Sequence, residues 1–417
     1  MTQNNRRLIL CMPHMSGREM DYIQKAIDAN WAVPMGPDVN AFEAELQHFL
    51  DTRKPVVALS SGTAAIHLAL IAAGVKSGDE VICQSMTFSA SANPIAYVGA
   101  RPVFIDSEAK TWNMDPELLK QTIISRQELT GKLPAAIICV HLYGMPAKMA
   151  EICAIAREFG ITLIEDAAEA FGSEYDGQMA GTMGDFGILS FNGNKMITTS
   201  GGGALVCPDE ATARRVMFFA TQAREGYPYY QHEQIGYNYR LSNISACIGR
   251  AQLEIAADHI AHHRQVNKIY RELFSEVPGV EVHVDPAPEW DSNYWLTTIL
   301  LAPEIRVKGR EKAYEQTISG AIGGAAGVTS AVSNPHTSVE PDTDVEALRM
   351  ALAADNIESR PLWKPMHCQP VFASAPAAVN GVSVELFRRG LCLPSGPDIT
   401  EGDQQRIVNH ISAHLVR

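Results

Sequence analysis

Seven short apolar runs, rich in β-branched residues and separated by longer segments, constrain the fold of this chain more than any other feature. The runs are 55–60, 80–85, 101–106, 135–144, 161–166, 186–191 and 203–207. Runs of this length and composition are typical of buried strands. Most connections between them are long enough to hold a crossover helix. The pattern therefore predicts an α/β fold with a mainly parallel, seven-stranded sheet that carries helices on both faces.

The residues that follow these runs are candidates for ligand contacts, because ligands of such sheets gather at the carboxyl ends of the strands. After the first run, Ser61, Gly62 and Thr63 open a predicted helix. Small residues there let the backbone approach an anion, and the free N–H groups of the first helical turn point toward it. An ordinary helix cap has the same sequence, so both interpretations stay open for this stretch.

Other strand ends also carry side chains suited to a ligand. Phe88 follows the second run with an aromatic ring, and Ser190 lies near the end of the sixth. Asp166 ends the fifth run, and Glu169 follows it by almost one helical turn. A carboxylate in the position of Asp166 is either a helix cap or a fixed partner for a cationic group of a ligand.

Lys195 stands alone in a nearly uncharged loop, NGNKMITTSGGG, between the sixth and seventh runs. No other lysine occurs between Lys148 and Lys268. One interpretation is a loop lysine that merely lies between two strands. The other is a desolvated amine that forms a Schiff base with a carbonyl compound. The loop by itself does not decide between them.

Together these side chains have the types that one cofactor, pyridoxal 5′-phosphate, requires. Its phosphate needs N–H groups and hydroxyls, its ring an aromatic face, its pyridine nitrogen a carboxylate and its aldehyde a lysine. The candidates are Ser61, Gly62, Thr63 and Ser190 for the phosphate, Phe88 for the ring, Asp166 for the nitrogen and Lys195 for the aldehyde. Each signal is weak alone, but their order along one α/β domain favours a pyridoxal phosphate site.

Composition limits the other classes of function. The formal net charge of −13 disfavours non-specific binding to nucleic acid and to anionic membranes. The eight cysteines form no C-x-x-C pair, which predicts reduced thiols and neither a zinc site nor a disulfide framework. No apolar stretch has the length of a signal sequence or a membrane span. We therefore expect a cytoplasmic protein that binds no metal.

The chain of 417 residues exceeds one average domain. We expect 1–250 to form an N-terminal segment and a large cofactor-binding domain, and 251–417 to form a linking helix and a smaller C-terminal α/β domain. The connecting helix is predicted to start near Ser242 and to run through the 250s. Residues 316–341 are rich in Gly, Ala, Ser and Thr, and we interpret them as a flexible insertion without a chemical role.

Four segments have sequences that are more specific than the residue patterns described above: SSGTAAIHLAL, EDAAEAFGS, GDFGILSFNGNKMITTSGGG and GYNYRLSNISACIGRAQLE. They resemble the signature segments of the DegT/DnrJ/StrS family of sugar aminotransferases. The resemblance extends from about residue 13 to the C-terminus and is interrupted mainly by 316–341. It implies the aspartate aminotransferase (type I) fold, pyridoxal phosphate as cofactor and homodimers with shared active sites.

The resemblance also implies roles for individual residues. Lys195 would bind the cofactor covalently and move protons, and Asp166 would hold the pyridine nitrogen. Asn238 would reach the phosphate from the partner subunit. Glu169 would lie next to the 3′-oxygen of the cofactor, where many relatives have Gln or His. Substrate contacts are expected at Trp31, His232, Tyr294, Arg360, Lys364 and His367.

Three further segments, FNGNK, ESRPLWKPMH and LCLPSG, are most similar to one branch of the family, the bacillosamine-type transaminases. These aminate UDP-4-keto-6-deoxy-N-acetylhexosamines. The implied activity transfers the amino group of L-glutamate to C4 of such a sugar, for a surface polysaccharide or glycan. One alternative is an aminotransferase for another keto sugar nucleotide, dTDP-linked and 3-keto sugars included. The other is a pyridoxal phosphate-binding regulator without turnover, which the retention of Asp166 and Lys195 disfavours.

Overall fold

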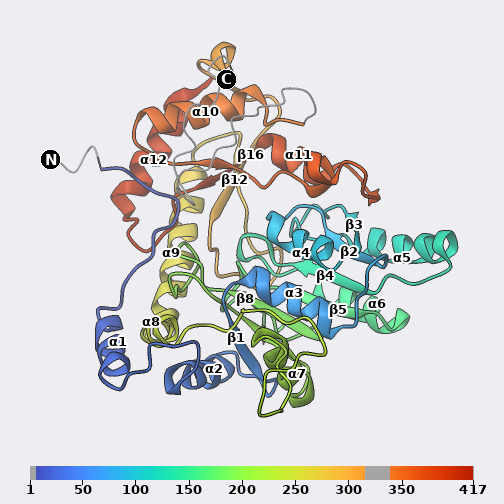
Figure 1. Cartoon of the computed structure of the whole chain (residues 1–417). Coiled ribbons are helices and arrows are strands. Elements are labelled where there is room, and N and C mark those ends of the chain that lie inside the picture. The colour runs from blue at the N-terminus through green and yellow to red at the C-terminus, as the bar shows by residue number, and fades with distance from the viewer. Residues whose placement is uncertain (1–5, 315–338, 417) are drawn as a thin grey trace.

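The computed structural model describes residues 6–314 and 339–416 of the chain (Figure 1). Most of the expected insertion at 316–341 therefore lies outside the described residues. Figure 1 shows a lower part built around a large sheet and an upper part built around a smaller one. The helix α9 (Ala256–Phe274) runs along one side of the molecule and connects the two parts.

The large sheet contains the seven expected strands and an eighth short strand at one edge. They span Val56–Leu59 (β1), Glu80–Gln84 (β2), Arg101–Ile105 (β3), Ala136–Val140 (β4), Thr162–Asp166 (β5), Phe186–Ser190 (β8), Gly203–Val206 (β9) and Ala377–Ala378 (β15). Their order is β1-β9-β8-β5-β4-β2-β3-β15. β9 is antiparallel to both neighbours, and every other pairing is parallel. The mainly parallel sheet is therefore confirmed, and β15 is an addition from the C-terminal half.

Helices cover both faces of the large sheet, as a parallel sheet requires. One face carries α3 (Gly62–Ala72), α4 (Asn93–Tyr97) and α7 (Glu210–Ala220). The other carries α2 (Pro37–Phe49), α5 (Pro116–Thr130), α6 (Met149–Phe159) and α8 (Asn243–Leu253), and α1 (Glu19–Asp28) packs against α8. Buried side chains such as Ile66 and Ile152 fill the two interfaces.

Short polar side chains start two helices that matter for the site. The hydroxyl of Ser61 caps α3 by accepting a hydrogen bond from the N–H of Ala64 over 3.0 Å. The hydroxyl of Ser242 caps α8 in the same way. The expected continuous linking helix is wrong, because α8 ends and α9 begins three residues later. Ile255 lies at the break with a ψ of 7°, which departs from helical geometry.

The smaller sheet belongs to the expected C-terminal α/β part. It is antiparallel in the order β10-β12-β16-β14, with β10 at Val280–Val282, β12 at Thr297–Leu301, β16 at Gly390–Leu393 and β14 at Arg360–Pro361. The C-terminal helices are α10 (Thr343–Ala354), α11 (Val382–Arg389) and α12 (Glu401–His414). Tyr270 of α9, Ile299 of β12 and Leu348 of α10 lie in one buried core.

Two short segments cross the expected division at residue 250. Leu8 forms a parallel bridge with Ile357 and is buried in the core of the smaller sheet. Conversely, β15 pairs with Phe104 and Ile105 of β3. The remaining short strands form two minor sheets: β6 (Glu174–Tyr175), β7 (Gln178–Met179) and β11 (Trp290–Asp291), and β13 (Arg306–Val307) with β17 (Leu415–Val416). The division into 1–250 and 251–417 stays a prediction.

Two general properties concern the helices and the cysteines. Searched over residues 6–314 and 339–416, the helices include none that is long and apolar enough to cross a membrane. The eight cysteines are free, and six of them are buried. Burial raises the pKa of the Cys11 thiol to about 12, so this thiol stays protonated at neutral pH.

Candidate active site

The expected cofactor contacts lie where the parallel strands of the large sheet end. Ser61 follows β1, and Phe88 follows β2 after a short link. Asp166 and Ser190 are the last residues of β5 and β8, which are adjacent and parallel. Lys195 follows in the loop after β8. Parallel strands end at a common edge, so the fold gathers these side chains on one side of the sheet.

The first turn of α3 packs against the end of β8. A Cβ built on Gly62 would lie 3.3 Å from Cβ and 3.6 Å from Oγ of Ser190. A Cβ on Gly203 would overlap the backbone N of Gly62, so position 203 requires glycine. The N–H groups of Gly62 and Thr63 have no acceptor within their own helix. Ser61 still has its O–H to donate while its oxygen caps α3. Donors grouped in this way at a helix N-terminus suit a phosphate.

Asp166 is almost fully buried and is oriented from two sides. The hydroxyl of Ser91 donates to Oδ2 over 2.6 Å, and the hydroxyl of Thr87 donates to Ser91 over 2.7 Å. The N–H of Ala168 donates to Oδ1 over 3.1 Å. The bond from Ala168 is the local one that a capping carboxylate makes. The bond from Ser91 comes from another segment and holds the carboxylate at the sheet edge.

Lys195 is largely withdrawn from solvent, with 13% of its side chain exposed. Its Nζ lies 3.5 Å from Oε1 of Glu169 and 3.9 Å from the ring centroid of Trp295. Its backbone N–H donates to the carbonyl of Asn192 over 2.9 Å, in the turn that follows β8. These surroundings match a desolvated amine with two specific partners, Glu169 and Trp295, and differ from those of a solvated loop lysine.

Glu169 connects Lys195 to two further segments. The N–H of Tyr143 donates to Oε2 over 2.7 Å, and Nε1–H of Trp363 donates to Oε1 over 3.3 Å. Burial raises the pKa of Glu169, whereas the charge of Lys195 and the N–H donors oppose that rise. The ionised form of this buried carboxylate therefore depends on the lysine.

Phe88 and Trp363 form an aromatic pair beside these groups. Phe88 is 52% exposed although it follows a buried strand, and the two ring centroids lie 5.3 Å apart. The backbone N–H of Trp363 donates to the hydroxyl of Tyr143 over 2.7 Å. These contacts join the segment 360–368 to the large sheet. The exposed ring of Phe88 is available to stack on a planar ligand.

Arg360 and Lys364, two expected substrate contacts, lie in this same segment 360–368. Arg360 donates to Oε1 of Glu358 over 3.1 Å. Nζ of Lys364 lies 3.8 Å from the carboxylate of Glu340. Each cation thus has a carboxylate from outside the segment within reach.

His367 and Tyr294 make polar contacts that hold their own surroundings. Nδ1 of His367 lies 2.6 Å from the hydroxyl of Ser85, directly after β2, and burial lowers the pKa of His367. The hydroxyl of Tyr294 accepts from the N–H of Asp285 over 3.0 Å. His367 is therefore at the sheet edge that carries the site, whereas the phenol of Tyr294 is bonded to a neighbouring loop.

The remaining expected contacts lie on exposed segments. The ring of Trp31 lies against Gly36, ahead of α2. His232 donates from Nδ1 to the carbonyl of Gln222 over 2.9 Å, and its side chain is exposed. Asn238 is also exposed and forms a backbone bridge with Thr221. The role expected for Asn238 involves a second subunit, so it stays a prediction.

The structure adds residues that the sequence analysis missed: Trp295, Trp363, Tyr143, Ser91 and Thr87. Two of them carried a signal. Trp363 lies in a proline-punctuated loop that also holds three expected substrate contacts, and Thr87 directly precedes Phe88. Trp295 carried no such signal, because a tryptophan directly before an apolar run is typical of a buried core residue.

This set of groups fits pyridoxal phosphate. A helix N-terminus with free donors, an exposed aromatic ring, an oriented carboxylate and a desolvated amine meet at one sheet edge. Within the ranges that the structure describes, no three His, Cys, Asp or Glu side chains are grouped so as to hold a metal ion.

Comparison with known proteins assigns the family. The model of the DegT/DnrJ/EryC1/StrS aminotransferase family matches residues 13–329 and 326–412. EpsN of Bacillus subtilis, whose name places it among pyridoxal phosphate-dependent aminotransferases, is 44% identical over 99% of this chain and 96% of its own. The GDP-perosamine synthase of Escherichia coli O157:H7 is 35% identical over 93% of both chains.

A solved structure agrees with these sequence matches. The crystal structure of a DegT DnrJ EryC1 StrS aminotransferase from Brucella abortus superposes with a TM-score of 0.79, at 28% identity and over 95% of both chains. Fold, site chemistry and relatives coincide over nearly the whole length. The chain belongs to the DegT/DnrJ/EryC1/StrS aminotransferase family and is a pyridoxal phosphate-dependent sugar aminotransferase.

Proposed function

We propose that the enzyme transfers the amino group of L-glutamate to C4 of a UDP-4-keto-6-deoxy-N-acetylhexosamine. The product is a UDP-4-amino-4,6-dideoxy sugar for a surface polysaccharide or glycan. One observation carries the choice of sugar. The hydrogen bond from Trp363 to Glu169 places the segment ESRPLWKPMH next to the residue that contacts Lys195. The sequence of this segment resembles that of the UDP-sugar branch, so its position beside the site favours a UDP-linked sugar.

The cofactor contacts follow from the groups at the sheet edge. Gly62, Thr63 and Ser190, together with Ser61, would hold the phosphate. Phe88 would stack on the ring.

The reacting end of the site has three further roles. Asp166 would keep the pyridine nitrogen protonated, and Glu169 would lie beside the 3′-oxygen. Bound pyridoxal phosphate supplies an aldehyde carbon that carries the amino group and a ring that accepts electron density. Nζ of Lys195 would take a proton from the carbon that bears the amino group and would later return one to C4 of the sugar.

The sugar nucleotide requires local positive charge, because the protein is acidic overall and the substrate carries a diphosphate. Arg360, Lys364 and His367 supply polar groups in the segment that contacts the site. A bound diphosphate would compete with Glu358 and Glu340 for the two cations. We therefore assign these three residues to the nucleotide part of the substrate. Trp31, His232 and Tyr294 remain weaker candidates.

A second sugar class is favoured by a separate observation. The GDP-perosamine synthase of Escherichia coli O157:H7 matches nearly all of this chain at 35% identity. A GDP-linked 4-keto sugar is therefore the alternative acceptor, with the same chemistry at Lys195. We further infer that the enzyme works in the cytoplasm as a homodimer, with Asn238 reaching the partner's phosphate site. The exposure of Asn238 supports that arrangement.

Side-by-side kinetics test the sugar assignment. Purified enzyme is supplied with L-glutamate and with UDP-4-keto-6-deoxy-N-acetylglucosamine, a GDP-4-keto-6-deoxyhexose or a dTDP-4-keto-6-deoxyhexose. Formation of 2-oxoglutarate gives kcat/KM, and NMR identifies the aminated carbon. We expect the UDP sugar to be preferred by at least about 100-fold, the size of a discrimination that loses several polar contacts. A preference for the GDP sugar would replace the first proposal by the second.

Variants of the basic residues test where the nucleotide binds. Arg360→Gln and Lys364→Gln should raise KM for the sugar about tenfold and leave the glutamate half-reaction unchanged. Loss of the visible cofactor absorbance on addition of glutamate follows that half-reaction alone. Lys120→Gln serves as a control, because Lys120 pairs with Glu158 at an exposed position. Equal damage to both half-reactions would remove Arg360 and Lys364 from the nucleotide site.

A further inference from the structure

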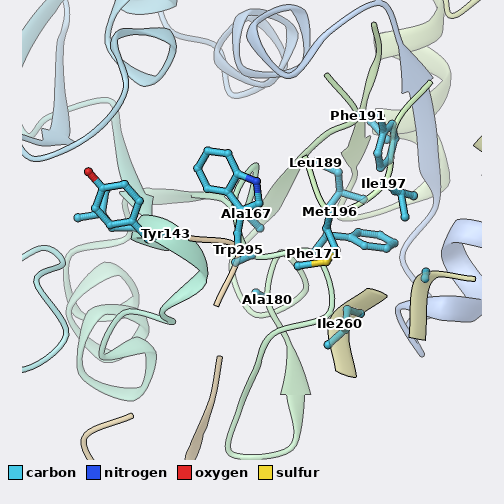
Figure 2. Close-up of a cluster of buried hydrophobic side chains, with 14 of the residues drawn as sticks. Tyr143, Ala167, Phe171, Ala180, Leu189, Phe191, Met196, Ile197, Ile260 and Trp295 are labelled. Atoms are coloured by element: carbon cyan, nitrogen blue, oxygen red, sulfur yellow. The ribbon is translucent and has the colours of Figure 1, made fainter. Parts of the chain in front are cut away.

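Trp295 makes two contacts with the loop that carries the reactive lysine. Its ring lies under Nζ of Lys195 at 3.9 Å, and its Nε1–H donates to the carbonyl of Asn194 over 2.6 Å. The side chain is 2% exposed, so both contacts are shielded from water. Figure 2 shows Trp295 in the same buried cluster as Tyr143 and Met196, the residue after the lysine. One indole therefore holds both the amine and the turn beneath it.

The backbone before Trp295 is fixed by a separate set of bonds. The backbone N–H of Trp295 donates to Oδ1 of Asn293 over 2.8 Å. The amide of Asn293 donates to the carbonyl of Glu169 over 3.1 Å and to that of Phe171 over 3.0 Å. Tyr294 adopts a φ of 48°, which L-residues rarely adopt without support. The segment 293–295 thus joins Trp295 to the segment that carries Glu169.

Helix α9 supports both loops from behind. Nδ1 of His263 lies 3.3 Å from the carbonyl of Tyr294, and Nδ1 of His259 lies 3.3 Å from the carbonyl of Met196. The two histidines are one helical turn apart, so they project from the same face of α9. A carbonyl only accepts, so each ring must carry its proton on Nδ1. Burial lowers the pKa of His263 to about 3 and also lowers that of His259, which keeps both rings neutral.

We propose that Trp295 is a positioning residue, which holds the amine of Lys195 in place whenever the amine is not covalently engaged, and that His263 fixes Trp295 in turn. The indole ring holds the ammonium form of Lys195 more firmly than any other side-chain ring would. The bond to Asn194 holds the turn before Lys195 whether its amine is charged or neutral. The amine must stay in one position and orientation while it transfers a proton. A rigid indole ring beneath the amine therefore favours the chemical step. The proposal rests on the family's aminotransferase activity and is independent of which sugar is accepted.

Substitution of Trp295 gives the first test. Trp295→Phe keeps a ring but loses the bond to Asn194, and Trp295→Leu loses both contacts. We expect kcat to fall about 10-fold in the first and about 100-fold in the second, with KM for glutamate and for the sugar within twofold of wild type. Trp290→Leu is the matched control. The Nε1–H of Trp290 also donates to a backbone carbonyl, but that carbonyl belongs to Pro146 rather than to the loop of Lys195.

A readout without turnover separates positioning from general damage. Pyridoxal phosphate is added to the cofactor-free protein, and the rise of visible absorbance gives the rate constant for covalent capture by the lysine. Capture should slow in the order wild type, Trp295→Phe, Trp295→Leu, and Trp290→Leu should match wild type. Unchanged capture and kcat in both Trp295 variants would overturn the proposal.

Paired substitutions at His263 test the support and remain informative if Trp295→Leu does not fold. The amide nitrogen of Asn takes the place of Nδ1, whereas that of Gln takes the place of Nε2. His263→Asn should therefore keep kcat and capture within about threefold of wild type, and His263→Gln should lose about tenfold in both. His283 bonds the carbonyl of Lys110 through Nε2, so its Asn and Gln variants are controls and should leave capture unchanged. Equal loss in His263→Asn and His263→Gln would remove His263 from the support of the lysine.

Discussion

The indole N–H of Trp363 and the carboxylate of Glu169 lie 3.3 Å apart in a hydrogen bond between residues far apart in the chain. Trp363 belongs to the segment after β14, and Glu169 follows β5 of the large sheet. Because Glu169 also faces Lys195, this bond connects the C-terminal part of the chain to the amine of Lys195. A change at Trp363 should therefore affect the chemistry as well as the packing.

Trp363→Phe should lower kcat/KM about 10-fold, because a hydrogen bond to a charged acceptor contributes about 1.5–3 kcal/mol. Phenylalanine keeps a ring next to Phe88 and removes only the N–H. Steady-state kinetics with both substrates measure the effect. Trp290→Phe, which also loses an indole bond, is the control. If both variants stay within twofold of wild type, the bond to Glu169 has no part in catalysis.

Lys195→Ala should abolish turnover while the protein stays folded, because the proton carrier is lost and the other expected cofactor contacts remain. Cofactor retention after gel filtration, thermal unfolding and product formation are measured together. Lys54→Ala, which removes a lysine bonded to the carbonyl of Thr182, should cost stability without abolishing turnover. Steady-state activity above about 1% of wild type in Lys195→Ala would refute its catalytic assignment.

Asp166→Asn should reduce kcat by at least about 100-fold, since a neutral amide no longer favours a protonated pyridine nitrogen. Ser91→Ala, which removes the hydroxyl that orients Asp166, should cost less than about tenfold. The ratio of the two effects separates charge from orientation. Should Asp166→Asn act within a few-fold of wild type, the residue is a helix cap and nothing more.

Hybrid dimers should reveal whether Asn238 serves the neighbouring subunit. Lys195→Ala and an impaired Asn238→Ala variant are mixed under conditions that allow subunit exchange. One site of each hybrid then has both residues intact, so part of the activity should return. Native mass spectrometry confirms exchange. Exchange without recovered activity would place Asn238 in its own subunit's site or outside any site.

The buried His263 predicts a pH dependence of stability. Its folded-state pKa of about 3 lies below the ordinary 6.5, so the unfolded chain takes up the proton first as the pH falls. The folded state therefore loses stability between pH 6.5 and 3. Between pH 7 and pH 5 this residue should cost about 2 kcal/mol of unfolding free energy.

His263→Asn keeps the donor to Tyr294 and removes the titrating ring, so it isolates that effect. Denaturant unfolding at pH 7 and pH 5 should show a smaller loss in the variant than in wild type, by about 2 kcal/mol. His259 titrates in both proteins and cancels in the comparison. Equal losses would mean that His263 takes up its proton in the folded state.

The large sheet could be predicted because each of its seven long strands is encoded locally. The run ITLIED is apolar and β-branched, follows Gly160 and ends in two acidic residues, and it became β5 with Asp166 at its end. β15 could not be predicted, since two alanines after Pro376 have no strand preference of their own. It is a strand only because β3 offers it a partner.

The break between α8 and α9 was missed for a similar reason. No glycine or proline stands at Glu254–Ile255 to announce it, and the helical pattern continues on both sides. The placement of Asp166, Ser190 and Phe88 at one edge of the sheet was predictable, because each ends or follows a locally encoded strand. The contacts of Trp295 and Trp363 with Lys195 and Glu169 arise from tertiary packing between distant segments, and no spacing in the sequence encodes them.

The pairing of β15 with β3 has a consequence for synthesis of the chain. About 270 residues separate Ile105 from Ala377, so at roughly 5–20 residues per second the outer edge of β3 waits some tens of seconds for its partner. The N–H groups of Phe104 and Asp106 face that edge, and in the finished protein they donate to the carbonyls of Pro376, just before β15, and Ala378. Pro102 lies on the same side of the strand and offers no N–H at all, which shortens the row of donors that another nascent chain could join. A chain released before residue 377 would keep the outer edge of β3 unpaired. Ribosome stalling before that residue should therefore yield aggregates rather than a truncated but working enzyme.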